Sequence, residues 1–257
     1  MLQGKVVVVS GVGPGLGRAV AVRAAESGAD VVLAARSENV LAEVAAAVEK
    51  TGRRALPVPT DITDDASARA LAAAALDAFG RVDVLVNNAF AVPELAELAG
   101  IDLDAVRAGF ETDVYAALRM TQLFAPSLVE NDGSIVMVSS VAVRRSQPTF
   151  GAYKMSKTSL IALAQTLASE LGPQGVRVNT VVPGSIWADA LKGYYEYLAA
   201  ERGVPVQEVY DETAANLDLR RLPEADEVAN AVVFLASDLA RAITGQCLDV
   251  NGGEFHN

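Results

Sequence analysis

KVVVVSGVGPGLG, residues 5 to 17, runs from β-branched residues into a glycine-rich turn and then into an alanine-rich segment. β-branched side chains favour strands, and glycines before a helix let the backbone approach a pyrophosphate at the helix N-terminus. A tight turn that binds no ligand is the alternative interpretation. The turn residues that we expect to contact a pyrophosphate-containing ligand are Gly11, Gly13, Gly15, Leu16 and Gly17.

The same alternation of short β-branched runs and long alanine-rich segments continues along the chain. Strands are expected at residues 5 to 10, 30 to 35, 54 to 59, 82 to 87, 133 to 139, 176 to 182 and 246 to 250. Helices are expected at about 15 to 28, 38 to 51, 64 to 79, 102 to 127, 151 to 172 and 225 to 237. This pattern predicts an α/β fold with a doubly wound, seven-stranded parallel sheet of the Rossmann type and helices on both faces.

The chain shows no internal repeat and no low-complexity linker, so we expect one dinucleotide-binding domain over residues 1 to 257. Residues 188 to 223 interrupt the alternation with tyrosines and charged side chains. We expect these residues to form a helical insertion before the last helix, of the kind that often builds a lid or a substrate wall.

The composition excludes several classes of function. The 32 acidic and 21 basic residues give a net charge of -11, which argues against binding to nucleic acids or to anionic membranes. The chain contains no run of eighteen apolar residues, so we expect no membrane-spanning helix. The single cysteine cannot form an internal disulfide and no signal-peptide pattern is visible, so we expect a cytoplasmic protein. With one histidine, His256, we expect neither a metal site nor a Ser-His-Asp mechanism.

Residues after the second and third strands are candidates for the adenosine half of a dinucleotide. Many NAD sites place a carboxylate after the second strand, where this chain has Ala35 and Arg36. An uncharged residue followed by arginine suits a 2′-phosphate, which favours NADP(H); a solvated arginine, with NAD(H) as the cofactor, is the alternative. Asp61 and Ile62 are candidates to flank the adenine ring, although Asp61 is equally suited to cap a helix.

Polar groups that follow the fourth and fifth strands are expected at the same edge of the sheet. Asn88 and Ala89 follow the fourth strand, and Ser140 follows the fifth. Tyr153 and Lys157 are one helical turn apart and share a helix face. Because a free tyrosine titrates near pH ~10, a neighbouring ammonium would favour its phenolate and bring it toward neutral pH. The sequence therefore predicts an acid/base site of an oxidoreductase beside a bound dinucleotide.

Together these motifs resemble the short-chain dehydrogenase/reductase family, of the type with Y-x-x-x-K, over nearly the entire chain. SGVGPGLG is similar to the family's cofactor turn, NNA to its motif after the fourth strand, and YKMSK to its Y-x-x-x-K motif. PGSI resembles its turn after the sixth strand, and ITGQCLDVNGG its last strand. The resemblance implies an NAD(P)-dependent oxidoreductase that transfers a hydride between a nicotinamide and a secondary alcohol or ketone.

The resemblance also implies roles for single residues. Tyr153 would be the acid/base and Ser140 would orient the substrate oxygen. Lys157 would bind the nicotinamide ribose and tune Tyr153, and Ile186 would offer its backbone to the carboxamide. A homotetramer built through the fourth and fifth helices is implied as well.

Three residues depart from the family pattern. Asp113 stands where the family has a catalytic asparagine; a carboxylate accepts hydrogen bonds but cannot donate as an amide does. Facing Lys157 through water, Asp113 would favour the ammonium; a purely structural carboxylate is the alternative. Phe90 replaces a glycine, which adds an aromatic wall near the nicotinamide or forces a different loop, and Ala188 replaces a threonine.

These departures keep a second class of function open, namely a dinucleotide-binding regulatory or scaffolding protein whose catalysis has decayed. A dehydratase or epimerase would need further acid/base groups, which the sequence does not reveal. The apolar and aromatic insertion suggests a mid-sized, partly hydrophobic small molecule as the substrate.

Five remaining residues receive structural interpretations. Arg144 and Arg145 are expected to be solvated loop arginines, in preference to contacts for an anionic substrate. Trp187 either shapes the pocket or packs beneath the insertion. Cys247 is expected to be a buried, inert thiol in a core strand, and His256 to belong to the tail or to an interface.

Overall fold

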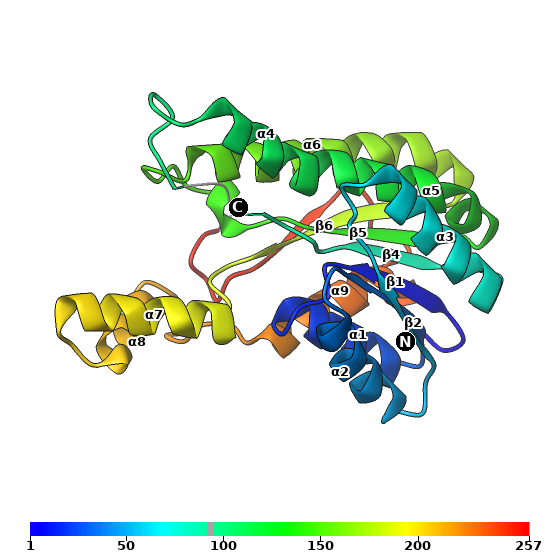
Figure 1. The fold of residues 1–257 in the computed structure, drawn as a ribbon, viewed down its shortest axis with the longest axis horizontal. Coiled ribbons are helices and arrows are strands. Elements are labelled where there is room, and N and C mark those ends of the chain that lie inside the picture. Colours follow the sequence, from blue (N-terminus) through cyan, green and yellow to red (C-terminus); the bar gives the residue numbers. More distant parts are fainter. Residues whose placement is uncertain (92–94, 257) are drawn as a thin grey trace.

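The computed structural model describes residues 1–91 and 95–256. Within these residues, seven strands form one sheet in the order β3-β2-β1-β4-β5-β6-β7, and every neighbouring pair is parallel. The strands are β1 (Val6–Ser10), β2 (Asp30–Ala35), β3 (Ala55–Pro59), β4 (Val84–Asn87), β5 (Ser134–Val138), β6 (Arg177–Pro183) and β7 (Cys247–Val250). The predicted doubly wound parallel sheet is confirmed (Figure 1).

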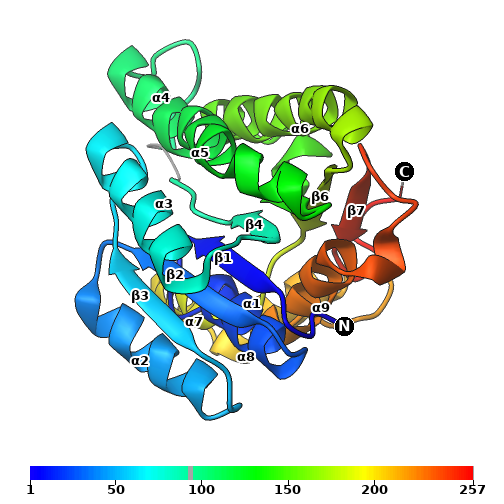
Figure 2. The ribbon, with the colours of Figure 1, turned by 90° about the vertical axis from the view of Figure 1, so that its right-hand side faces the viewer.

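Helices cover both faces of this sheet. The α-helices are α1 (Leu16–Glu26), α2 (Glu38–Glu49), α3 (Asp65–Phe79), α4 (Leu103–Phe110), α5 (Ala116–Glu130), α6 (Gly151–Leu171), α7 (Asp189–Arg202), α8 (Val206–Ala214) and α9 (Ala225–Ala236). Figure 2 shows α1, α2 and α9 below the sheet and α3, α5 and α6 above it, and two separate apolar clusters fill these layers. Among the described helices, none has both the length and the apolar character that a membrane crossing requires.

One predicted helix is wrong in its form. Residues 102 to 127 do not make a single α-helix, because a π-helical segment, Glu111–Tyr115, separates α4 from α5. The wider π turn accommodates an additional residue and places the side chain of Asp113 in the interior, toward α6. The α5 helix then continues past Pro126 to Glu130. Apolar periodicity shows that a stretch is helical, but it does not show which turn is widened.

The order of the strands decides where a ligand site lies. Strands β1 and β4 are neighbours, and their connecting helices leave toward opposite faces of the sheet. The carboxyl ends of these two strands, at Ser10 and Asn87, therefore border the crevice where doubly wound sheets bind ligands. Strand β7 lies at the edge of the sheet, so its first residue, Cys247, is only partly buried and is not the core residue that the sequence predicted.

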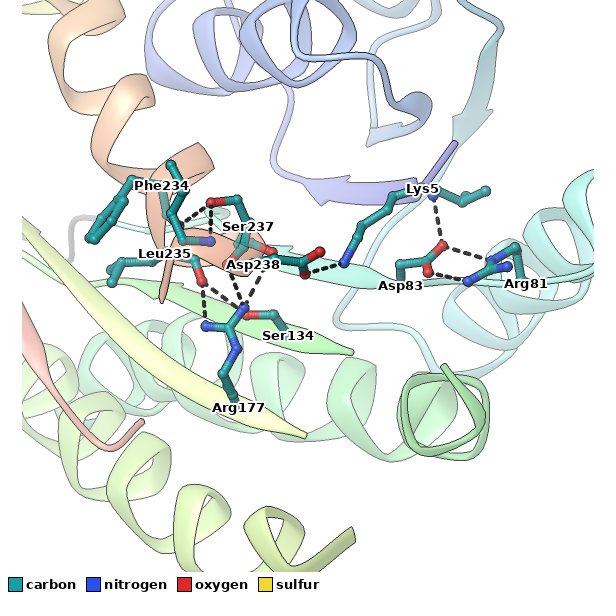
Figure 3. Close-up of polar contacts among 12 residues, drawn as sticks. Lys5, Arg81, Asp83, Ser134, Arg177, Phe234, Leu235, Ser237 and Asp238 are labelled. Atoms are coloured by element: carbon teal, nitrogen blue, oxygen red, sulfur yellow. Dashed lines mark hydrogen bonds and ion pairs between the residues drawn. The ribbon is translucent and has the colours of Figure 1, made fainter. Parts of the chain in front are cut away.

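At the amino ends of the strands, a guanidinium joins the sheet to α9. Arg177, at the start of β6, donates to the carbonyl oxygens of Leu235, Ala236 and Ser237 at 2.7, 3.4 and 3.1 Å (Figure 3). These carbonyls lie at the end of α9, where the α-helical hydrogen bonds stop. Burial lowers the pKa of Arg177. This side chain therefore joins the α9 terminus to the sheet.

Two acidic side chains, Asp83 and Asp238, form further contacts at the amino ends of the strands. The buried carboxylate of Asp83 accepts hydrogen bonds from the backbone of Val6 and from the side chain of Arg81, the latter visible in Figure 3. Lys5 pairs with Asp238 at 2.8 Å. These contacts connect the amino ends of β1 and β4 to the segment after α9.

The insertion is helical, as its sequence suggested, and consists of α7 and α8, which project away from the sheet (Figure 1). The two helices enclose a small apolar cluster of their own. The ring of Trp187 lies 5.6 Å from that of Tyr195 and 4.8 Å from that of Tyr210, between centroids. Trp187 thus packs beneath the insertion.

We expect Arg177→Met to lower the free energy of unfolding by roughly 1–3 kcal/mol, because methionine fills similar space but removes the guanidinium that donates to three carbonyls. Urea denaturation measures the change. The exposed Arg241 supplies the control, and Arg241→Met should alter stability little. Equal losses in the two variants would contradict this role of Arg177.

Candidate active site

The glycine turn between β1 and α1 packs against the end of β4. Gly11 has φ +76°, and a Cβ atom at this position would lie 2.4 Å from Cα of Ala89. A Cβ atom at Gly17 would lie 2.4 Å from the carbonyl oxygen of Gly11. The side-chain amide of Asn88 donates to that same carbonyl at 2.8 Å. Both glycines are therefore required by the close approach of the two strand ends.

The other glycines of the turn leave space above it. A Cβ atom at Gly13 would meet nothing within 4 Å, and one at Gly15 would meet only Ala188, at 3.6 Å. The turn thus presents open backbone at the N-terminus of α1, which fits a pyrophosphate. Leu16 follows the turn and lines a cavity described below. Ala188 faces this turn and is not among the residues that line that cavity.

A cavity of about 480 Å³ opens beside the turn, at the ends of β2 and β3. Arg36, Asp61, Ile62 and Ala89 are four of its lining residues. Asp61 accepts hydrogen bonds from the backbone and the hydroxyl of Thr63, and these bonds lower the pKa of its carboxyl. The cap of α3 is Asp64, so the interpretation of Asp61 as the helix cap is wrong. The cavity has the position and the volume for an adenosine group.

A smaller cavity of about 140 Å³ lies over the ends of β4, β5 and β6. Its walls combine residues that the sequence singled out from five separate segments. They are Leu16, Asn88, Phe90, Ser140, Tyr153, Lys157 and Ile186. The exposed ring of Phe90 stands in this wall, with its centroid 5.7 Å from Nζ of Lys157. The site residues therefore converge on one cavity next to the glycine turn.

Beneath this cavity, Asp113 and Lys157 form a buried ion pair. Their side chains are 0% and 1% exposed, and Nζ of Lys157 lies 3.6 Å from Oδ1 of Asp113. The contact is direct, because the π-helical turn brings the carboxylate against α6. Asp113 also accepts from Ser156 at 2.6 Å and from the backbone of Ala91 at 3.0 Å, and Lys157 donates to the carbonyl of Val138 at 3.3 Å.

The electrostatics of Tyr153 differ from the expectation. Burial raises the pKa of Tyr153 to about 12, a hydrogen bond with Ser140 opposes the increase, and the negative charge of Asp113 adds to it. Burial lowers the pKa of Lys157, while Asp113 acts in the opposite direction. The predicted shift of Tyr153 toward neutral pH is therefore wrong for this structure. The charge of Lys157 is paired with Asp113, and desolvation of the phenolate dominates.

A third cavity, of about 680 Å³, shares Ser140 and Tyr153 with the small one and extends to the insertion. Tyr194 and Tyr195 of α7 form part of its wall, and Glu254 and Phe255 approach it from the C-terminal segment. Such a volume, with mixed aromatic and polar walls, suits a small organic molecule. Ser140 and Tyr153 lie where the two cavities meet.

Both loop arginines form ion pairs; Arg144 is largely withdrawn from solvent, contrary to the expectation, whereas Arg145 stays exposed, as expected. Arg144 pairs with Asp249 at 2.7 Å, and Arg145 pairs with Glu254 at 3.1 Å. Each arginine thus ties the loop after β5 to the segment around β7. His256 is exposed and contacts Asp218 at 2.8 Å, outside the 680 Å³ cavity.

Sequence reasoning missed Ser156 and Glu254. Ser156 precedes Lys157 in the motif and was the available signal for a hydrogen-bond partner of Asp113. Glu254 follows Gly252 and Gly253, whose φ angles of +66° and +83° mark a tight turn after the last strand. Two consecutive glycines predict such a turn, but not that it returns to the site.

Known proteins are similar to this chain in sequence and in fold. The family model described as Enoyl-(Acyl carrier protein) reductase matches residues 11–254. L-Rhamnose 1-dehydrogenase (NAD(P)(+)) of Sphingomonas sp. (strain SKA58) is 35% identical over 260 residues, which cover 100% of this chain and 98% of that protein. The 7alpha-hydroxysteroid dehydrogenase of Escherichia coli (strain K12) is 31% identical over 254 residues, covering 98% of this chain and 94% of that protein.

A solved structure agrees with these similarities. The crystal structure of NAD+-bound xylitol dehydrogenase superposes with a TM-score of 0.90 and 27% sequence identity. The superposition covers 98% of this chain and 99% of that one. The arrangement of strands and helices is thus shared along nearly the full length.

We expect Asp113→Asn to lower the pKa of the Tyr153 phenol from about 12, because a neutral amide no longer opposes the phenolate charge. Carbon-13 NMR of labelled tyrosine, with the signal assigned by Tyr153→Phe, follows this titration. The exposed Asp104 provides the control, and Asp104→Asn should leave the pKa of Tyr153 unchanged. An unchanged or higher pKa in Asp113→Asn would count against the proposed coupling.

Proposed function

Because this chain belongs to the short-chain dehydrogenase/reductase family, we propose that it transfers a hydride between NADP(H) and a secondary alcohol or ketone, with Tyr153 moving the proton. The chain is an NAD(P)-dependent oxidoreductase that acts on CH–OH groups. The observation that carries the finer proposal is the position of Ser140 and Tyr153 at the junction of the two cavities. Lys157 lies at the base of the smaller one.

The cofactor assignments follow the three parts of the site. Gly11, Gly15 and Gly17 would hold the pyrophosphate at the turn, and the 480 Å³ cavity would take the adenosine. Lys157 and Ile186 line the 140 Å³ cavity, which would take the nicotinamide and its ribose. When bound there, the nicotinamide supplies or accepts the hydride.

The side chains of this site would position the substrate oxygen and move its proton. In ketone reduction, the hydroxyls of Ser140 and Tyr153 donate to the carbonyl oxygen and stabilise the negative charge that develops on it. The phenol proton of Tyr153 then passes to this oxygen as the hydride reaches the carbon. In alcohol oxidation the phenolate accepts the proton. The raised pKa of Tyr153 keeps the phenol protonated at neutral pH, which favours reduction there and oxidation in more alkaline solution.

The preference for NADP(H) is supported by charge at the rim of the adenosine cavity. Ala35 and Arg36 line it, and neither supplies the carboxylate that many NAD sites use for the ribose. An exposed guanidinium there offers two or more donors to a 2′-phosphate. We therefore retain NADP(H) as the preferred cofactor and NAD(H) as the alternative.

The insertion and the surface of α4 to α6 supply the remaining parts of the proposal. Residues 188 to 223 would form a substrate wall, because Tyr194 and Tyr195 line the larger cavity. Assembly into a homotetramer would use the helices α4 to α6, where Leu103, Tyr115 and Met155 are exposed apolar residues.

The alternative of a decayed binding protein has less support. A protein that only binds a dinucleotide has no need for Ser140, Tyr153 and Lys157 around one cavity. Asp113 also makes ordered contacts with Ser156 and Lys157, so the departure from asparagine leaves the base of the site connected.

We expect Tyr153→Phe to lower kcat with alcohol and ketone substrates by at least about a thousandfold, because the ring remains but the proton donor is lost. Dinucleotide affinity, measured by fluorescence titration, should change less than about threefold. Tyr197→Phe, on an exposed tyrosine outside the cavities, is the matched control. Nearly full activity in Tyr153→Phe would refute the assignment.

We expect Arg36→Glu to weaken NADP(H) binding roughly a hundredfold or more, because it replaces an attractive charge with a repulsive one. NAD(H) lacks the 2′-phosphate and should lose less than about tenfold. Dissociation constants for both dinucleotides test this difference, with Arg241→Glu as a surface control. Equal losses for the two dinucleotides would show that Arg36 does not read the phosphate.

A further inference from the structure

The 680 Å³ cavity contains a carboxylate that its protein partners satisfy only in part. The side chain of Glu254 is 9% exposed, and its Oε1 accepts a hydrogen bond from Arg145 at 3.1 Å. Its Oε2 is buried and has no hydrogen-bond partner among the described residues. A buried acceptor without a donor raises the free energy of the folded state, and a donor from a bound molecule would remove this penalty.

The position of Glu254 is fixed by the turn that precedes it. Asn251 accepts a hydrogen bond from the backbone of Gly253 at 2.9 Å and donates to the carbonyl of Phe255 at 3.1 Å. A Cβ atom at Gly253 would lie 2.6 Å from Asp218, so the turn packs tightly against the end of the insertion. The carboxylate is therefore held at a defined place in the wall.

The charges of this cavity balance within the chain. Its four charged lining residues form two pairs. Arg145 pairs with Glu254, and Arg202 donates to both carboxylate oxygens of Glu212 at 2.6 and 2.7 Å. Each charge in the wall therefore has an opposite charge beside it, and these side chains give the cavity no net charge. The cavity consequently favours a neutral molecule.

The remaining wall of the cavity combines aromatic rings with the carboxylate of Glu254. Phe150, Tyr194 and Tyr195 contribute aromatic surface, and the hydroxyl of Tyr195 already donates to Thr213 at 2.8 Å. Burial raises the pKa of Glu254, as expected for a carboxylate withdrawn from water, while Arg145 opposes this change. Glu254 thus lines the same cavity as Ser140 and Tyr153, and one of its two carboxylate oxygens has no partner among the described residues.

We propose that Glu254 is a specificity-determining residue that accepts a hydrogen bond from a second hydroxyl of the substrate. The substrate class is then a neutral, polyhydroxylated molecule, a cyclic polyol or sugar, which places one carbinol at Ser140 and Tyr153 and another hydroxyl at Oε2 of Glu254. Its C–H face packs against the aromatic wall. This inference rests on the proposed oxidoreductase function and assigns the class of alcohol that the same site accepts.

The test compares alcohols that differ by one hydroxyl. Cyclohexanol is paired with cyclohexane-1,2-diol and cyclohexane-1,3-diol, and a 2,6-dideoxyhexose with the corresponding 6-deoxyhexose, with oxidation followed as dinucleotide reduction. In the wild type, kcat/KM should be higher for the more hydroxylated member of a pair. Glu254→Leu should lower kcat/KM for that member by roughly tenfold to a hundredfold, the range for one hydrogen bond to a charged group. Oxidation of the less hydroxylated member should change less than about threefold.

Two further variants keep the result interpretable. Glu254→Gln retains an acceptor oxygen of similar shape and should preserve most of the discrimination between the paired alcohols. Glu26→Leu removes a carboxylate paired with Arg23 on α1, away from the cavity, and should leave discrimination unchanged. Dinucleotide binding by each variant shows whether it is folded.

The outcomes separate this inference from the proposed function. Loss of discrimination in Glu254→Leu, with retention in Glu254→Gln, supports the inference. Equal losses for both members of each pair, or a wild-type preference for the less hydroxylated members, overturn it while the oxidoreductase function stands. Absence of turnover with every alcohol and ketone tested contradicts the proposed function, and with it this inference.

Discussion

The buried pair of Asp113 and Lys157 is the contact on which the arrangement of the site depends. A carboxylate and an ammonium that are both withdrawn from water require each other, because breaking such a pair leaves an uncompensated charge in the interior. The pair also gathers backbone from distant parts of the chain, through the amide of Ala91 after β4 and the carbonyl of Val138 at the end of β5. It thereby joins the π-helical turn, two strand ends and α6 beneath one small cavity.

This pairing has a consequence for the acid/base chemistry. With Asp113 beside it, the charge of Lys157 is balanced locally, and the pKa of Tyr153 is governed first by burial. The site therefore holds a phenol that retains its proton at neutral pH. An asparagine at residue 113 would leave the ammonium without a neighbouring anion and would remove the charge that adds to the raised pKa of Tyr153.

The amino ends and the carboxyl ends of the strands have different roles. At the amino ends of the strands, Arg177 and Asp83 satisfy backbone groups and join the sheet to α9 and to β1. At the carboxyl ends, the glycine turn leaves backbone open and the larger cavity retains an acceptor, Oε2 of Glu254, without a partner in the described chain. Satisfied polar groups stabilise the fold at the amino ends, and open backbone and an unpartnered acceptor remain at the carboxyl ends.

The sequence by itself determined the parallel sheet, five of the helical segments to within two residues at each end, and the edge where Ser140, Tyr153 and Lys157 meet. These features follow from local patterns: β-branched runs, glycine turns and the spacing of side chains along a helix. Tertiary structure alone decided the π-helical turn at Asp113, the direct contact with Lys157, the pairing of Arg145 with Glu254 and the packing of Trp187. Each of these joins residues distant in the chain, and their burial and charge partners exist only once the layers have packed together.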